Sequence, residues 1–153
     1  MVFSLLSKTP KVILEKLNRV LIALYGAKEI CEKTALTVEN RQLRYTILGL
    51  AQESKQYANE LKSHLQILEG EISGMDSHAE MNYSGQSNKM DWEITSEKNK
   101  LDLCTHNEKM IVQAYSELLN EPHLYENIRE MIRYQLRGLL QSFSKLKLLS
   151  TSI

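Results

Sequence analysis

The sequence contains few of the residues that interrupt helices or cross-link small folds. It has two prolines, six glycines and two cysteines among 153 residues. So few helix-breaking residues suit long helices, and two cysteines cannot form the disulfide framework of a small secreted domain. Both cysteines, Cys31 and Cys104, fall on helical stripes of mostly apolar residues. We therefore expect them to be buried, reduced and unreactive in a cytoplasmic protein, with a redox-sensor role as the alternative.

Net charge and long apolar runs are also missing. Nineteen basic residues balance nineteen acidic ones, so no overall field favours nucleic acid or an anionic membrane. The apolar start, residues 1–6, is far too short to span a bilayer, and it lacks the basic residues and the cleavage site of a signal peptide. We expect a cytoplasmic protein without a transmembrane segment, folded as a single domain over residues 1–153.

The most informative feature of the chain is a set of four apolar stripes. They run over residues 13–34, 43–68, 101–118 and 124–149, in steps of three and four residues. Such steps place side chains on one face of a helix, and a face this long must be buried. The third stripe contains a carboxylate, Glu108, in an otherwise apolar row. The stripes predict an all-α protein, a four-helix bundle.

Start signals and loop residues set the expected helix bounds. We expect helices over about 11–35, from Thr37 or Asn40 to 69, from Asp91 or Glu97 to 119, and over about 123–149. The first and third connections are short and predict antiparallel hairpins. Residues 70–91 form a crossover loop long enough to travel the whole second helix. A ferritin-like order therefore follows, with the second and third helices parallel; a simple up-and-down order is the alternative.

Several short motifs occur in a characteristic order. Residues 57–61 read Tyr-Ala-Asn-Glu-Leu, Trp92 follows near the end of the crossover, and Cys104, Glu108 and Tyr115 come next. These match the aromatic-alanine-x-glutamate-leucine signature, the tryptophan, and the helix-3 cysteine, glutamate and tyrosine of a bacterial ferritin-like four-helix-bundle family of unknown function. The chain resembles that family over roughly residues 14–148. The resemblance implies the same fold.

The chain also departs from that family at polar positions. Thr105 and Asn107 stand where the family commonly has a second glutamate and a glycine. The acidic turn of its first helix falls near residues 24–27, and a histidine late in its fourth helix falls near Phe143. These departures remove groups that a metal site would use.

A dinuclear iron or manganese site needs a glutamate from each of two helices and a Glu-x-x-His pair from each of the others. The sequence contains no Glu-x-x-His pair. A carboxylate-rich metal-binding protein stays an alternative reading. Its candidate ligands are Glu29 or Glu32, Glu53, Glu108 and Glu130.

Glu108 needs a partner if it is buried, because an unpaired carboxylate in an apolar core is strongly unfavourable. We predict a polar core in which Glu108 hydrogen-bonds to Gln135, a residue that interrupts the fourth stripe and offers two N–H donors. A metal or small-ligand role and an exposed Glu108 on a rotated helix are the alternatives.

No arrangement of nucleophile and base and no glycine-rich phosphate loop can be argued from the sequence, so we do not expect an enzyme. The leading hypothesis is a metal-free relative of ferritin-like proteins that acts through protein interactions, with a role in the stress response. Its protein partner is unknown, and a homodimer is one form that such an interaction can take. A further hypothesis is a module that docks on a partner or a membrane surface through the crossover or the apolar N-terminus.

Overall fold

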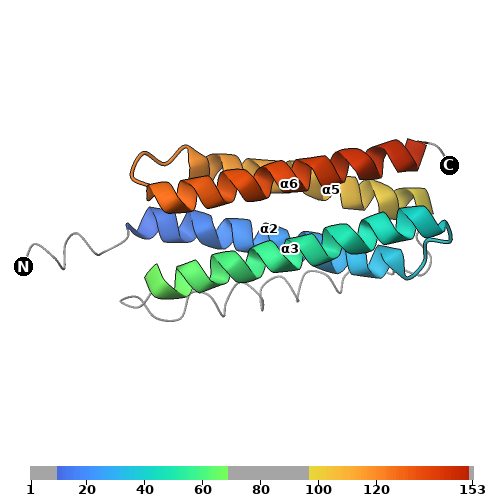
Figure 1. Ribbon diagram of the computed structural model, residues 1–153, viewed down its shortest axis with the longest axis horizontal. Coiled ribbons are helices and arrows are strands. Elements are labelled where there is room, and N and C mark those ends of the chain that lie inside the picture. The colour runs from blue at the N-terminus through green and yellow to red at the C-terminus, as the bar shows by residue number, and fades with distance from the viewer. Residues whose placement is uncertain (1–9, 69–96, 152–153) are drawn as a thin grey trace, which may run out of the picture.

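A computed structural model describes residues 10–68 and 97–151 of the chain. Within these ranges it contains four α-helices and no β-strand (Figure 1). The helices are α2 (Lys11–Ala35), α3 (Arg41–Leu68), α5 (Glu97–Leu119) and α6 (Glu126–Thr151). The all-α prediction is therefore confirmed for the described residues. The expected crossover, residues 70–91, and Trp92 lie outside them.

Local sequence explains where the helices begin. Asn40 caps α3, because its Oδ1 accepts a hydrogen bond from the Leu43 amide at 2.9 Å. Pro10 precedes α2 in an extended conformation, with φ −56° and ψ 141°, so it stands one position before the first helical residue rather than at it. The fourth helix begins at Glu126, slightly later than expected. The Arg129 guanidinium donates to the carbonyls of Leu119 and Glu121 and thereby ties the start of α6 to the end of α5.

The helices form a bundle in which α2 packs against α3 and α5, and α6 packs against the same two helices. Helices α2 and α6 therefore lie on one diagonal, and α3 and α5 on the other. Figure 1 shows α3 and α5 running in the same direction, opposite to α2 and α6, so that α3 ends and α5 begins at opposite ends of the bundle. These directions agree with those expected for the second and third helices.

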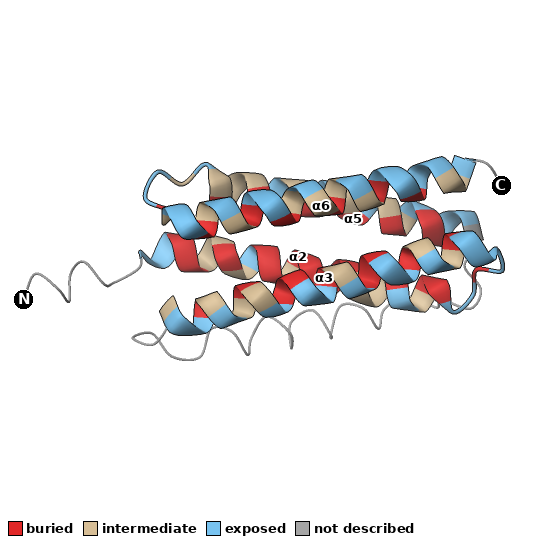
Figure 2. Cartoon of the chain, viewed as in Figure 1, coloured by how far each residue is buried: buried red, intermediate tan, exposed pale blue. Residues whose placement is uncertain are grey.

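The interior is built from the predicted stripes, whose residues face inward on all four described helices (Figure 2). Leu50 and Leu139 are fully enclosed, as expected. One residue of the third stripe does not fit: Glu108 is only partly buried, whereas Asn107 is buried and donates from Nδ2 to the Leu103 carbonyl at 3.1 Å. Glu108 therefore lies at the edge of the core, although the other residues of the third stripe are buried.

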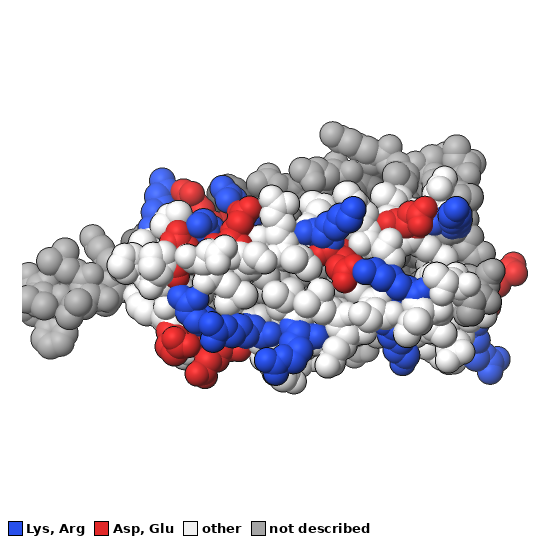
Figure 3. All heavy atoms as spheres, turned by 90° about the horizontal axis from the view of Figure 1, so that it is seen from above, with Lys and Arg blue, Asp and Glu red and all other residues white. Residues whose placement is uncertain are grey.

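The outer surface mixes charges of both signs. Figure 3 shows Lys, Arg, Asp and Glu side chains interspersed over the face that α5 and α6 form. Arg19 of α2 pairs with Glu117 of α5 at 3.2 Å, and Lys16 of α2 pairs with Glu121, in the connection between α5 and α6, at 3.0 Å. Among the described residues, no helix has the length and apolar character needed to cross a membrane.

Candidate functional site

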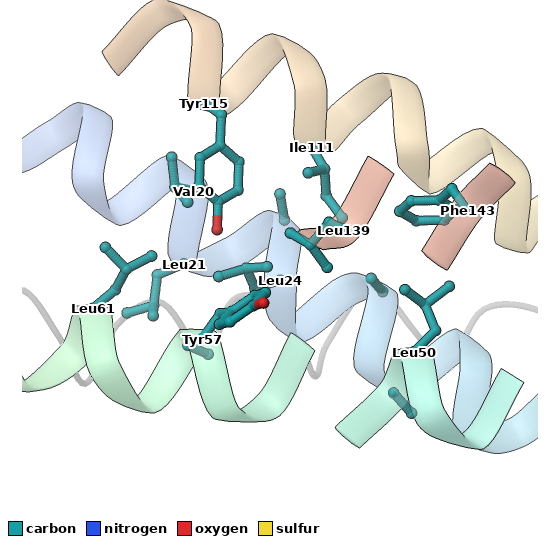
Figure 4. Close-up of a cluster of buried hydrophobic side chains, with 14 of the residues drawn as sticks. Val20, Leu21, Leu24, Leu50, Tyr57, Leu61, Ile111, Tyr115, Leu139 and Phe143 are labelled. Carbon is teal, nitrogen blue, oxygen red and sulfur yellow. The ribbon is translucent and has the colours of Figure 1, made fainter. Parts of the chain in front are cut away.

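A hydrogen-bonded network crosses the interior between α3, α5 and α6. Gln135 on α6 lies at its centre and is fully buried. Its Oε1 accepts from the Tyr115 hydroxyl of α5 at 2.8 Å. Its Nε2 donates to Glu60 Oε1 at 2.9 Å and to the Tyr57 carbonyl at 3.4 Å, both on α3. A single amide therefore links three helices through directed bonds. Figure 4 shows Tyr57 and Tyr115 of this network among the apolar side chains of the core, which include Leu24, Leu61 and Leu139.

A second carboxylate lies farther along the interface between α3 and α6. Glu53 Oε2 accepts from the Tyr57 hydroxyl at 3.0 Å, and Glu53 Oε1 accepts from Ser142 Oγ at 2.6 Å. Because each carboxylate oxygen accepts from a neutral hydroxyl, the orientation of Glu53 is fixed without an ion pair. Tyr57 thus belongs to both parts of the network, through its hydroxyl and through its carbonyl.

Gly138 makes this arrangement sterically feasible. A Cβ at this position would lie 2.5 Å from the Tyr57 hydroxyl oxygen and 2.8 Å from Glu53 Oε2. Both distances are far inside van der Waals contact, so any larger residue on α6 would displace the tyrosine and the carboxylate. The glycine therefore allows polar groups of α3 to lie against the backbone of α6.

The two tyrosines of the network are held in their neutral form. Burial raises the pKa of Tyr115 well above its ordinary value, and the nearby Tyr57, Glu60 and Glu53 add to the effect. Burial and the hydrogen bond to Glu53 also raise the pKa of Tyr57. Both phenols therefore remain hydrogen-bond donors throughout the physiological pH range.

A groove opens on the surface beside this network. It has a volume of about 500 Å³ and lies between α3 and α6. Its lining includes Tyr45, Gly49, Glu53, Tyr134, Ser142 and Lys145. Tyr45 and Tyr134 are 64% and 67% exposed, and the Tyr134 ring contacts Tyr57 edge to face at 6.4 Å between centroids. The groove thus combines aromatic rings, a fixed carboxylate and a lysine.

The predicted bond between Glu108 and Gln135 is not formed. Glu108 instead pairs with Lys147 of α6, and its side chain is 16% exposed. The reason is that Glu108 and Gln135 lie at different heights along the axis of the bundle. Lys147 lies twelve residues beyond Gln135 on α6, which corresponds to ~18 Å along a helix. Gln135 meets Tyr115, two turns away from Glu108 on α5, so the polar-core prediction was correct for Gln135 and wrong about its partner.

The candidate metal ligands have separate partners. Glu29 pairs with Lys33 at 3.4 Å, Glu53 accepts from two hydroxyls, Glu108 pairs with Lys147, and Glu130 is exposed on α6. Over residues 10–68 and 97–151, no three His, Cys, Asp or Glu side chains form a group that could hold a metal ion. The structure therefore does not bring these four carboxylates together.

The cysteines lie as expected. Cys31 and Cys104 are both fully buried and free. Cys104 Sγ lies 3.3 Å from Thr34 Oγ1, and Thr34 is one turn beyond Cys31 on α2. A hydrogen bond with Cys104, together with burial, raises the pKa of Cys31 well above its ordinary value. The prediction that both cysteines are buried is confirmed.

Sequence reasoning missed Glu60, Gly138 and Ser142 as members of the site. Glu60 lies beside the second stripe in the sequence, and its carboxylate accepts a hydrogen bond from Gln135 in the structure. A signal was present, since Glu53, Tyr57 and Glu60 follow at steps of four and three and must share one side of α3. Gly138 and Ser142 of α6 show no comparable spacing in the sequence that would assign them to the site.

Comparison of this chain with protein-family models, curated proteins and solved structures finds no match.

Proposed function

We propose that this protein is a non-enzymatic, ferritin-like helical bundle that acts through protein interactions. The order and directions of its helices support a ferritin-like relationship, since α3 and α5 run parallel. Its interior carboxylates support a role without metal, because Glu53 and Glu60 already accept hydrogen bonds from uncharged donors. Such donors hold the carboxylates in fixed orientations without a charged ligand.

The groove between α3 and α6 is the surface that we assign to partner binding. The observation that carries this assignment is Glu53, a carboxylate whose two oxygens are held by hydroxyl groups, with no ion pair to a described residue. Exposed Tyr134 and Tyr45 lie in the same groove. Aromatic faces beside a carboxylate recognise cations, and tyrosine is enriched at protein interfaces. We therefore expect a lysine or arginine of the partner to bind at Glu53.

The charges in the groove also predict how acidic and basic residues are arranged on the partner. Lys145 of α6 lines it together with Glu53. A partner segment that carries an acidic residue beside its basic one would satisfy both side chains at once. Opposite charges placed in register in this way favour one partner over others and orient it on the surface.

The experiment places a photo-crosslinking amino acid at position 134, in the groove, or at the exposed position 109 on α5. Each protein is irradiated in the cells that produce it, and crosslinked species are identified by mass spectrometry. Glu53→Gln removes the charge in the groove and keeps an oxygen acceptor. Glu39→Gln makes the same change at an exposed site ahead of α3 and serves as the control.

We expect a species that crosslinks from position 134 and not from position 109. Its yield should fall about fivefold or more in Glu53→Gln and stay unchanged in Glu39→Gln, because the charge at Glu53 is the recognition element. Equal crosslinking from both positions, or a yield that does not depend on Glu53, would contradict the proposal. Crosslinking to a second copy of the chain, with the same dependence on Glu53, would identify the partner as the protein itself.

A further inference from the structure

A dithiol lies in the interior between α2 and α5, away from the groove. Cys31 and Thr34 occupy one face of α2, and Cys104 reaches them from α5, with its Sγ 3.3 Å from Thr34 Oγ1. Cys31 lies one turn before Thr34 on α2, so Cys104 also lies close to Cys31, and neither thiol is exposed to solvent. The two thiols interact strongly enough to perturb each other's pKa. A disulfide requires Cα atoms within ~7 Å of each other.

We propose that Cys31 and Cys104 form a redox-active pair that a small hydroperoxide oxidises to a disulfide joining α2 to α5. The pair is distinct from the proposed binding groove, which uses α3 and α6. The inference rests on the contacts between the two thiols and Thr34, and it does not depend on the partner-binding role.

The surroundings assign different parts to the two sulfurs. The hydrogen bond from Cys31, assisted by Thr34, lowers the pKa of Cys104 against the effect of burial. The same contact and burial raise the pKa of Cys31. Cys104 is therefore the thiol that ionises first, and the thiolate is the form that attacks peroxide. Cys31 is the thiol that then attacks the oxidised Cys104 and forms the disulfide.

The reaction balances in two steps. The Cys104 thiolate attacks one oxygen of hydrogen peroxide, the O–O bond breaks, and Cys104 becomes a sulfenic acid. The departing hydroxide takes up the proton that Cys104 released, forming water. Cys31 sulfur then attacks Cys104 sulfur, the S–O bond breaks, and the leaving hydroxide takes the Cys31 proton to form a second water. Two electrons pass from the two sulfurs to the peroxide.

Burial determines which oxidants can react. Cys31 lies four residues before the end of α2 at Ala35, so local opening of the last turn exposes the pair without unfolding the bundle. Such an opening admits hydrogen peroxide more readily than a bulky thiol reagent. The disulfide would then restrict the chain between residues 31 and 104 and stabilise the bundle.

The test treats the full-length folded protein with hydrogen peroxide and analyses it without reduction. We expect an intact mass lower by two hydrogen atoms, a linked peptide pair containing Cys31 and Cys104, and a melting temperature raised by roughly 10 °C. Dithiothreitol should reverse all three changes. Cys31→Ala should stop the reaction at a sulfenic acid on Cys104, which dimedone traps. Cys104→Ala should leave Cys31 unmodified under the same conditions.

Three outcomes would overturn the proposal: a disulfide between two chains, oxidation of both sulfurs without a link, or formation of the link only in denaturant. Mapping of the wild-type peptides distinguishes these outcomes by itself, so the test stands even if an alanine variant fails to fold.

Discussion

Helices α2 and α6 lie on one diagonal of the bundle and contact the same two neighbours, yet they do so with different chemistry. Twelve of the 25 residues of α2 are buried, against six of the 26 in α6. The buried face of α2 is almost wholly apolar, with Thr34 as its hydroxyl group. The corresponding side of α6 carries Gln135 at its centre, with Gly138 and Ser142 facing polar groups of α3.

This difference separates stability from recognition. Apolar burial is non-directional and roughly proportional to area, so α2 can stabilise the bundle without defining a site. Polar groups need partners at fixed geometry, so the interface of α3 with α6 specifies one arrangement and leaves a carboxylate at the edge of a groove. We therefore assign most of the stability to α2 and the binding chemistry to the interface between α3 and α6.

The largest effect should come from shortening a core side chain of α2. Leu24 is fully buried, and Leu24→Ala should cost ~2–5 kcal/mol through lost contacts and a cavity. Leu139→Ala on α6 should fall in the same range but below Leu24→Ala. Lys55→Ala and Lys145→Ala, at exposed positions, should cost less than about 0.5 kcal/mol. Urea unfolding measures all four, and a lysine variant as costly as a leucine variant would contradict the assignment of faces.

The polar interior should be the next most sensitive. Gln135→Leu replaces the buried amide with an apolar side chain. The Tyr115 hydroxyl and the Glu60 carboxylate then lose their hydrogen-bond partner. We expect a loss of ~1–3 kcal/mol in the free energy of unfolding. The exposed Gln141 of the same helix offers the matched control, Gln141→Leu. Adding Tyr115→Phe to Gln135→Leu should recover part of the loss, and an additive double variant would show that the two residues do not interact.

Replacing two glycines of the bundle with alanine should change the stability of the protein in opposite directions. Gly138→Ala places a methyl group 2.5 Å from the Tyr57 hydroxyl oxygen and should cost ~1–2 kcal/mol. Gly49→Ala meets no atom within 4 Å and should stabilise the protein by ~0.5–1 kcal/mol, because alanine favours helix. Thermal melting of both variants checks this. The same sign for both would mean that the approach of α3 to Gly138 is not as close as described.

How far the sequence could predict these features depended on their periodicity. The stripe that contains Leu24 and the stripe that contains Leu139 set the four helices and their buried faces, since each extends over several turns. Asn40 marked the start of a helix by a local rule. The partner of Glu108 could not be predicted, because periodicity gives the buried face of a helix and not the height at which residues of two helices meet. Contacts such as Ser142 with Glu53 join residues far apart in the chain, and no spacing rule encodes them.

A smaller change in the free energy of unfolding should appear at alkaline pH. Burial raises the pKa of Tyr115 in the folded protein, so its phenol ionises in the unfolded chain first, near pH 10. The stabilisation from the neutral phenol is complete below pH 10 and is lost as the pH rises toward the folded-state pKa. Between pH 10 and 10.5 the wild type should lose ~0.5 kcal/mol more than Tyr115→Phe does. Urea titrations at both pH values test this, and identical losses would contradict it.

We propose that hydrogen bonds from uncharged donors, rather than a metal ion, satisfy the Glu53 and Glu60 carboxylates at the interface between α3 and α6. The most direct measurement is thermal melting of untagged protein with and without iron(II) or manganese(II), for the wild type, Glu53→Gln and Glu60→Gln. A ligand that binds only the folded state raises its melting temperature. We predict that all three melting temperatures change by less than about 1 °C on adding metal. A wild-type melting temperature that rises by several degrees, and does not rise in the glutamine variants, would contradict the claim and show that the interface is a metal site.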